Sequence, residues 1–373
     1  MPNQINSVTL IHGTYAKDAE WTHLNSPLAN ALRMRFGDKV KIEPAPPWSG
    51  LNNVTARKKA KEELINHLHK LQDRYRHKAN YFVVAHSHGG NVALYAIRDA
   101  KLKYPVGIAC LATPFLVTDF RILSDKKDIV EAITVLIYQF FISLALIIYG
   151  IVRLKSDIPT ITSSDQIFTI PFKVFAPSSI LEWITLVAGM VIAVSLGQLV
   201  TPWHKFAKQI RDELKLPWLP KFQLLIIRTT GDEASGLLAS FHLLSQLSAY
   251  ISQLMYRWTA ALNQLPPHMN NYPWAALFIP IRVFISILFF LSILTLSAFI
   301  LPFGWQLALT NLFLNTTAES TPLGSWETYL IAPKDLHKDN IKLQGFEHSK
   351  VHDSSYVHTI IADWIENITE DTQ

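Results

Sequence analysis

Residues 81–91 of the chain, Y-F-V-V-A-H-S-H-G-G-N, place a serine where it could act as a nucleophile. Strand-forming residues lead into Ser87, and a helical pattern begins at Asn91. A strand, a tight turn and a helix would lift the hydroxyl clear of a sheet and direct the N–H groups of the helix end at developing negative charge. Ala85 and Gly89, two residues to either side, are small enough for close backbone packing. An ordinary strand-to-helix turn is the alternative.

A second apolar strand, near the start of the chain, ends in His12-Gly13. Backbone N–H groups of the loop after that strand and of the residue after the serine could stabilise an oxyanion formed at Ser87. These donors would be Thr14 or Tyr15, together with His88.

A candidate acid follows a third apolar pattern, residues 222–228. This pattern leads into a glycine turn and then Asp232. An acidic residue just beyond the carboxyl end of a strand is well placed to orient a histidine. Asp232 could also cap the next helix, and the two roles are compatible. Glu233 is the alternative acid.

The candidate base lies near the C-terminus, before a helix expected over residues 356–368. His348 occupies a loop position that suits a general base. His352 is the rival, but it lies closer to the helix N-terminus, whose dipole disfavours an imidazolium. His358 falls within the helix beside its apolar stripe and is interpreted as a structural or surface residue. We therefore favour His348 among the 14 histidines.

The order Ser87, Asp232, His348 is the nucleophile–acid–base order of α/β-hydrolases. The chain resembles this superfamily and, within it, the bacterial lipase-like esterases, over roughly residues 8–118, 222–234 and 321–368. The resemblance rests on the motifs above and on the strand and A-T-P turn at residues 106–114. It implies an α/β-hydrolase fold, with a mostly parallel sheet flanked by helices, and ester hydrolysis through an acyl-enzyme. The mechanism needs no metal or other cofactor.

The sequence predicts a core that is interrupted twice. Strands are expected near residues 8–12, 40–43, 81–85, 106–111, 222–228 and 327–331. The core would comprise residues 1–127, 205–235 (with the acid) and 321–373 (with the base). Between these pieces we expect a transmembrane hairpin over residues 128–204 and a lid or membrane-inserted segment over residues 236–320.

The composition accounts for these interruptions, since 49% of residues are hydrophobic and only 17% are charged. Residues 132–152 and 183–203 carry no charge, and each is long enough to span a bilayer, which needs about 20 apolar residues. A pair of buried core helices is the alternative. Residues 283–301 could also span, but a single crossing would separate the base from the nucleophile, so this region must be a hairpin or partly inserted. Residues 236–256 predict an amphipathic helix over the site or on the membrane surface.

Charge indicates the surroundings of the protein. Lys and Arg are more frequent beside the two spans than in the loop between them, which predicts an integral membrane protein with a cytoplasmic catalytic domain. The N-terminus shows no secretory signal, and the single cysteine, Cys110, suits a reducing compartment. Residues 57–78 mix charges and predict an exposed amphipathic helix that anionic headgroups would attract. The mild net charge of +5, without a recognition module, argues against nucleic-acid binding, and no cluster has metal-ligand spacing.

These features together predict a membrane-embedded serine hydrolase that cleaves a carboxylic ester of a lipid-like substrate. An acyltransferase or thioesterase using the same three residues is an alternative. A membrane interaction protein with a vestigial hydrolase fold is another, which the complete set of residues disfavours.

Overall fold

The computed structural model describes residues 4–120, 200–217, 223–230, 303–310, 314–322, 327–332 and 347–371, and several residues between 232 and 243. Almost all of them belong to one compact unit, comprising Met1–Asp119, Gln209–Leu244 and Phe299–Gln373. Two of the expected spans, residues 132–152 and 283–301, lie outside the described residues. So does the span at residues 183–203, except for residues 200–203. Within the ranges just given, no helix combines the length and apolar character needed to cross a membrane.

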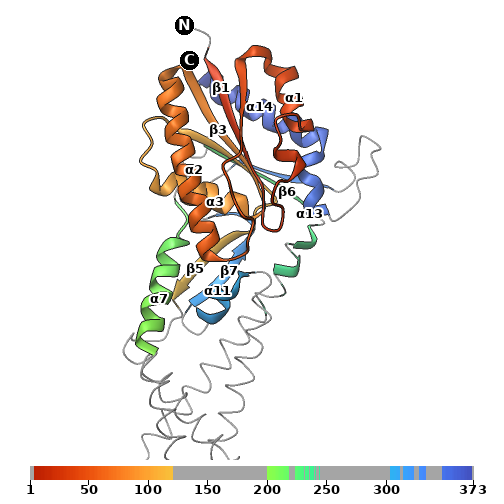
Figure 1. Cartoon of the computed structure of the whole chain (residues 1–373). Helices are drawn as coiled ribbons and strands as arrows, with labels where there is room; N and C mark the ends of the chain where they lie inside the picture. Colours follow the sequence, from red (N-terminus) through yellow and green to blue (C-terminus); the bar gives the residue numbers. More distant parts are fainter. Residues whose placement is uncertain are drawn as a thin grey trace, which may run out of the picture. The chain divides into compact units, whose positions relative to one another are not determined.

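A six-stranded sheet forms the centre of this unit (Figure 1), with strand order β2-β1-β3-β4-β6-β8. Every neighbouring pair is parallel, so the carboxyl ends of all six strands lie at one edge. Each of the six expected strands is confirmed, and the fold is of the α/β class. The bounds are β1 Ile5–Ile11, β2 Val40–Glu43, β3 Ala79–His86, β4 Val106–Leu111, β6 Leu224–Thr229 and β8 Glu327–Ile331.

Helices cover both faces of this sheet (Figure 1). On one face lie α1 (Pro27–Phe36) and α14 (Ser355–Asp371), and on the other α2 (Val54–Tyr75) and α3 (His88–Asp99). Successive strand side chains point to opposite faces. In β3, Phe82 and Val84 therefore join the core beneath α1 and α14.

The C-terminal helix confirms the apolar face expected from the sequence. Its side chains pack into the core with α1 and the sheet, while Ile368 is partly buried at its end. The fully buried members of this face are Val357, Ile360, Ile361, Trp364 and Ile365.

The basic segment at residues 57–78 is helical as expected, but the expectation of a simply exposed helix is wrong. Arg57 and Lys61 are buried. The Lys61 ammonium pairs with the carboxylates of Asp99, at 2.9 Å, and Glu213. Burial lowers the pKa of Lys61, but the two carboxylates outweigh it and leave the pKa above its ordinary value.

Two strands are missing from the sequence-based prediction. β5 (Phe115–Phe120) and β7 (Leu314–Glu319) pair in a separate two-stranded sheet. β7 reads L-N-T-T-A-E and lacks the apolar run that reveals the central strands. Among the described residues, further helices are α7 (Val200–Glu213), α11 (Trp305–Thr310) and α13 (Glu347–Lys350), and short 3-10 helices lie at Glu20–Thr22, Gly37–Lys39, Arg76–Lys78 and Val351–Asp353.

Candidate functional site

Ser87 lies at the turn between β3 and α3, as the sequence predicts. Its backbone has φ 53° and ψ −135°, a left-handed conformation that is uncommon for any residue other than glycine and costs about 1–3 kcal/mol. The Ser87 N–H donates to the carbonyl of Leu111 at 2.9 Å, which joins the turn to the end of β4. The serine is therefore held at the carboxyl edge of the sheet, where ligands bind in open α/β folds.

Glycines allow the neighbouring loops to approach the serine closely. A Cβ atom placed on Gly13 would lie 2.6 Å from the Ser87 Cβ and 3.2 Å from its Oγ. A Cβ on Gly89 would lie 2.5 Å from the backbone oxygen of His12. Ala85 is fully buried in β3, beside Ile11 of β1. The loop after β1 thus packs directly against the serine side chain.

The candidate oxyanion donors are placed differently from one another. Thr14 follows Gly13 at the serine, and His88 is the first residue of α3, at the positive end of the helix dipole. Tyr15, by contrast, has φ 59°, and its N–H donates to the carbonyl of Gly50 at 2.8 Å. The expectation that Tyr15 could serve is corrected accordingly, because its N–H is engaged by the loop before α2. Thr14 and His88 are the pair to test.

Two buried polar side chains fix the loops around the serine. The His12 ring stacks on Trp48, with 4.8 Å between centroids, and its Nδ1 bonds the carbonyl of the following residue at 2.8 Å. Asn91, which is 0% exposed, donates to the carbonyl of Pro114 at 2.7 Å and accepts from the N–H of Leu116 at 3.1 Å. This role of Asn91 could not be predicted from the sequence, because a single asparagine in a helix gives no signal of its own.

Asp232 and His348 lie together, as predicted. The Nδ1 atom of His348 is 2.9 Å from Oδ1 of Asp232, and the two side chains are 15% and 2% exposed. Because a carboxylate only accepts, Nδ1 carries the proton and Nε2 is the basic nitrogen. The same Oδ1 accepts from the N–H of Ala234 at 3.0 Å. Asp232 therefore makes both of the contacts expected from the sequence, one to a histidine ring and one to the backbone that follows it.

His348 lies on the one-turn helix α13 rather than in the loop that the sequence predicts. Three side chains attach it to the rest of the unit. Besides the bond to Asp232, its N–H donates to Glu233 at 3.3 Å, and its carbonyl accepts from His86 Nε2 at 2.8 Å. Glu233, the alternative acid, thus contacts the backbone of His348 and not its ring.

His86 is a second residue of this site, after Asn91, that could not be identified from the sequence. It immediately precedes Ser87 in the chain, and its ring contacts that of His348. The two rings are 4.8 Å apart between centroids. Burial, reinforced by the neighbouring His348 and His352, lowers the pKa of His86 well below its ordinary value. The only sequence signal was its position next to the serine.

The rival histidines have other partners. His352 pairs with Asp353 at 2.9 Å and stacks on Trp21, with centroids 5.0 Å apart. Its ring also meets that of His86 edge-on. His358 is 5% exposed and bonds the carbonyl of His352 through Nε2 at 2.9 Å, so it is structural. Pairing with a buried acid just past a central strand distinguishes His348 from both.

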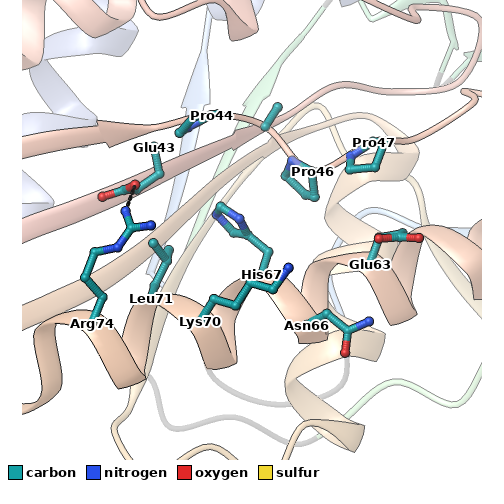
Figure 2. Close-up of a pocket in the computed structure, with 11 residues that line it drawn as sticks. Glu43, Pro44, Pro46, Pro47, Glu63, Asn66, His67, Lys70, Leu71 and Arg74 are labelled. Carbon is teal, nitrogen blue, oxygen red and sulfur yellow. Dashed lines mark ion pairs between the residues drawn. The ribbon is translucent and has the colours of Figure 1, made fainter.

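A pocket of about 280 Å³ lies elsewhere in the unit, between the end of β2 and α2. Figure 2 shows the His67 ring reaching from α2 toward the prolines of residues 44–47, and the pairing of Arg74 with Glu43. Burial first, and then the cations Arg74 and Lys70, lower the pKa of His67 to about 4. None of the residues that line this pocket belongs to the site around Ser87.

No protein-family model matches this chain, and the search of curated proteins found no similar one. Its function must therefore be inferred from the site itself.

Proposed function

We propose that this protein is a serine hydrolase of the α/β-hydrolase superfamily that cleaves a carboxylic ester of a lipid-like substrate. One observation carries the proposal. A serine in a left-handed turn lies at the carboxyl end of a central parallel strand, and the residue before it bonds the backbone of a histidine whose Nδ1 is 2.9 Å from a buried aspartate. Such a serine, histidine and aspartate form the set of groups that acyl transfer through a serine requires.

In the proposed reaction, Ser87 Oγ attacks the acyl carbonyl while His348 Nε2 takes the hydroxyl proton. The N–H groups of Thr14 and His88 stabilise the oxyanion that forms. His348 then gives the proton to the departing alkoxide, which leaves as the alcohol, and the acyl group stays on Ser87. Water next attacks the acyl-enzyme with His348 again as the base, releasing the acid and restoring the serine. Asp232 keeps the imidazole in the required tautomer and stabilises the imidazolium.

Two features support a lipid-like substrate. The charge-free segments at residues 132–152 and 183–203 are long enough to place the chain at a membrane. In addition, the loops beside the site expose large apolar side chains, with Tyr15 70% and Leu51 56% exposed. A bilayer as the surface that delivers the substrate is part of the same proposal.

Labelling by a fluorophosphonate probe tests the nucleophile. The full chain, purified in detergent, should be labelled at Ser87 and should hydrolyse p-nitrophenyl esters, with long acyl chains preferred to short ones. Ser87→Ala should abolish labelling and lower kcat by roughly a millionfold, to the level left by binding and the oxyanion donors. Ser7→Ala is the matched control, because Ser7 is also buried but lies in β1.

The outcomes separate the alternatives. An adduct on another residue, or an unlabelled and inactive wild-type protein, would contradict the proposal. Labelling at Ser87 with an acyl group passed to an added lipid alcohol, and little free acid, would instead identify an acyltransferase with the same nucleophile.

A further inference from the structure

His86 is a buried histidine for which the proposed reaction has no use. It is the last residue of β3 and 5% exposed. It immediately precedes the proposed nucleophile, and its ring meets those of His348 and His352, with centroids 4.8 Å and 4.9 Å away. Trp21 covers it edge-on at 6.2 Å. A polar ring enclosed in this way needs a hydrogen-bonding partner.

Its partner is the backbone of the proposed base. His86 Nε2 lies 2.8 Å from the carbonyl oxygen of His348. A carbonyl only accepts, so Nε2 of His86 carries the proton. This bond runs from the strand that carries Ser87 to the helix α13 that carries His348, and it joins residues 262 positions apart in the chain. α13 has only four residues, so it cannot fix the base by itself.

The surroundings keep His86 neutral. Burial, then the His348 and His352 rings, lower its pKa well below the ordinary value, whereas the bond to the His348 carbonyl and the Asp232 charge act weakly in the opposite direction. Asp353 faces His352 and Glu233 faces the His348 backbone. A neutral ring supplies an N–H donor without adding a second positive charge beside the imidazolium that His348 must become.

We propose that His86 is a positioning residue: its Nε2–H bond to the His348 carbonyl sets the distance of the base from Ser87. This inference rests on the proposed function for its effect on rate. A displacement of about 1 Å at a reacting group can cost about 100-fold, so the loss of this bond should reduce kcat and leave the binding of the substrate nearly unchanged.

Three variants isolate the bond. His86→Leu removes the donor and approximately keeps the volume, and His86→Gln replaces the ring with a side chain whose amide N–H can reach the same carbonyl. His358→Leu is the matched control, because His358 is equally buried, at 5% exposure, and its Nε2 bonds a histidine carbonyl at 2.9 Å, that of His352. His358→Leu thus removes the same kind of bond without touching the base.

We expect His86→Leu to lower kcat by about 10- to 100-fold, with KM changed less than about threefold. His86→Gln should recover most of the lost kcat. His358→Leu should lower the melting temperature comparably yet keep kcat within about threefold. Equal kcat values for His86→Leu and His358→Leu would overturn the inference, because His86 would then act only through stability.

A second measurement does not depend on turnover. In protein with 15N-labelled histidine, the Nδ1–H proton of His348 should give a downfield NMR signal while it is bonded to Asp232. The signal should weaken or shift in His86→Leu, return in His86→Gln and stay unchanged in His358→Leu. An unchanged signal in His86→Leu would refute positioning even if the protein proved inactive toward every ester. A changed signal in a protein whose Ser87 is never labelled would retain the positioning and refute the proposed function.

Discussion

The serine and the histidine of the site are held by different kinds of structure. On the serine side, the constraints are in the main chain: a left-handed turn between β3 and α3, and a glycine, Gly13, on which an added Cβ would lie 2.6 Å from the Ser87 Cβ. On the histidine side, a four-residue helix is held by side chains, through bonds of 2.9 Å to Asp232, 2.8 Å from His86 and 3.3 Å to Glu233.

The difference predicts two kinds of response to mutation. A close approach between main-chain segments cannot be weakened by degrees. A single carbon atom added at a glycine there displaces the whole turn. Side-chain bonds can be removed one at a time, and each carries only part of the positioning. We therefore expect steep losses on the serine side, and losses on the histidine side that are graded by how directly a residue contacts the imidazole.

The steepest loss on the histidine side should come from its two reacting partners. His348→Ala and Asp232→Asn should each lower kcat by about 10⁴-fold or more with little change in KM, because one removes the base and the other favours the wrong tautomer. Steady-state kinetics on a p-nitrophenyl ester measures both. If His348→Ala stays active while His352→Ala is inactive, the base is His352 and not His348.

The serine side can be tested without altering a reacting group. Gly89→Ala places a Cβ 2.5 Å from the His12 carbonyl oxygen, so the turn must shift. We expect a loss of about 100-fold in kcat and a destabilisation of about 1–3 kcal/mol from overpacking. Gly236→Ala is the control, since residue 236 is helical and exposed and a Cβ there meets nothing within 4 Å; it should stabilise the protein by about 0.5–1 kcal/mol. Full activity in Gly89→Ala would show that the turn tolerates displacement.

The fold could be predicted where local patterns determine it. Continuous apolar runs identify buried parallel strands, so β3, β4 and β6 are found from residues such as Val83 and Ile226. β7 escapes because its alternation of polar and apolar residues is short and weak. The burial of Lys61 could not be predicted either, because it depends on Glu213, a partner 152 positions away in the chain.

The residues of the site differ in the same way in whether the sequence could identify them. Ser87, Asp232 and His348 follow strand ends or precede a helix, and their order along the chain adds a second constraint. From the sequence, the backbone N–H of Tyr15 is a candidate oxyanion donor. In the folded protein this N–H donates to the carbonyl of Gly50 instead. His86 could not be assigned from the sequence because its role depends on the carbonyl of a residue that arrives from the far end of the chain.

A smaller effect is expected at the weakest bond on the histidine side. Glu233 is exposed, and its bond to the His348 N–H is 3.3 Å long. Glu233→Ala should lower kcat by only about threefold, as expected for a bond worth about 0.5–1 kcal/mol, and Glu233→Gln, which keeps an acceptor oxygen, should lower it less. A loss in Glu233→Ala as large as that in Asp232→Asn would make Glu233 the acid and reverse their roles.

The smallest effect on activity is expected at His67, which lies outside both sides of the site. Its pKa is lowered to about 4 in the folded protein, whereas an unfolded histidine titrates near 6.5. Between pH 6.5 and 4 the unfolded chain therefore binds a proton that the folded protein does not. Stability from this group is complete above pH 6.5 and falls as the pH is lowered through that window, by at most about 1.4 kcal/mol per pH unit.

His67→Gln should reduce this slope, because a glutamine does not titrate but can still bond the Thr9 hydroxyl, which lies 3.0 Å from His67 Nε2. His69→Gln, an exposed change on the same helix, is the control. Urea unfolding at several pH values between 7.5 and 4.5 gives the slope, and ester hydrolysis at pH 7.5 should be equal in all three proteins. An unchanged slope in His67→Gln would show that the acid sensitivity comes from another group, such as His86, whose pKa is also lowered by burial.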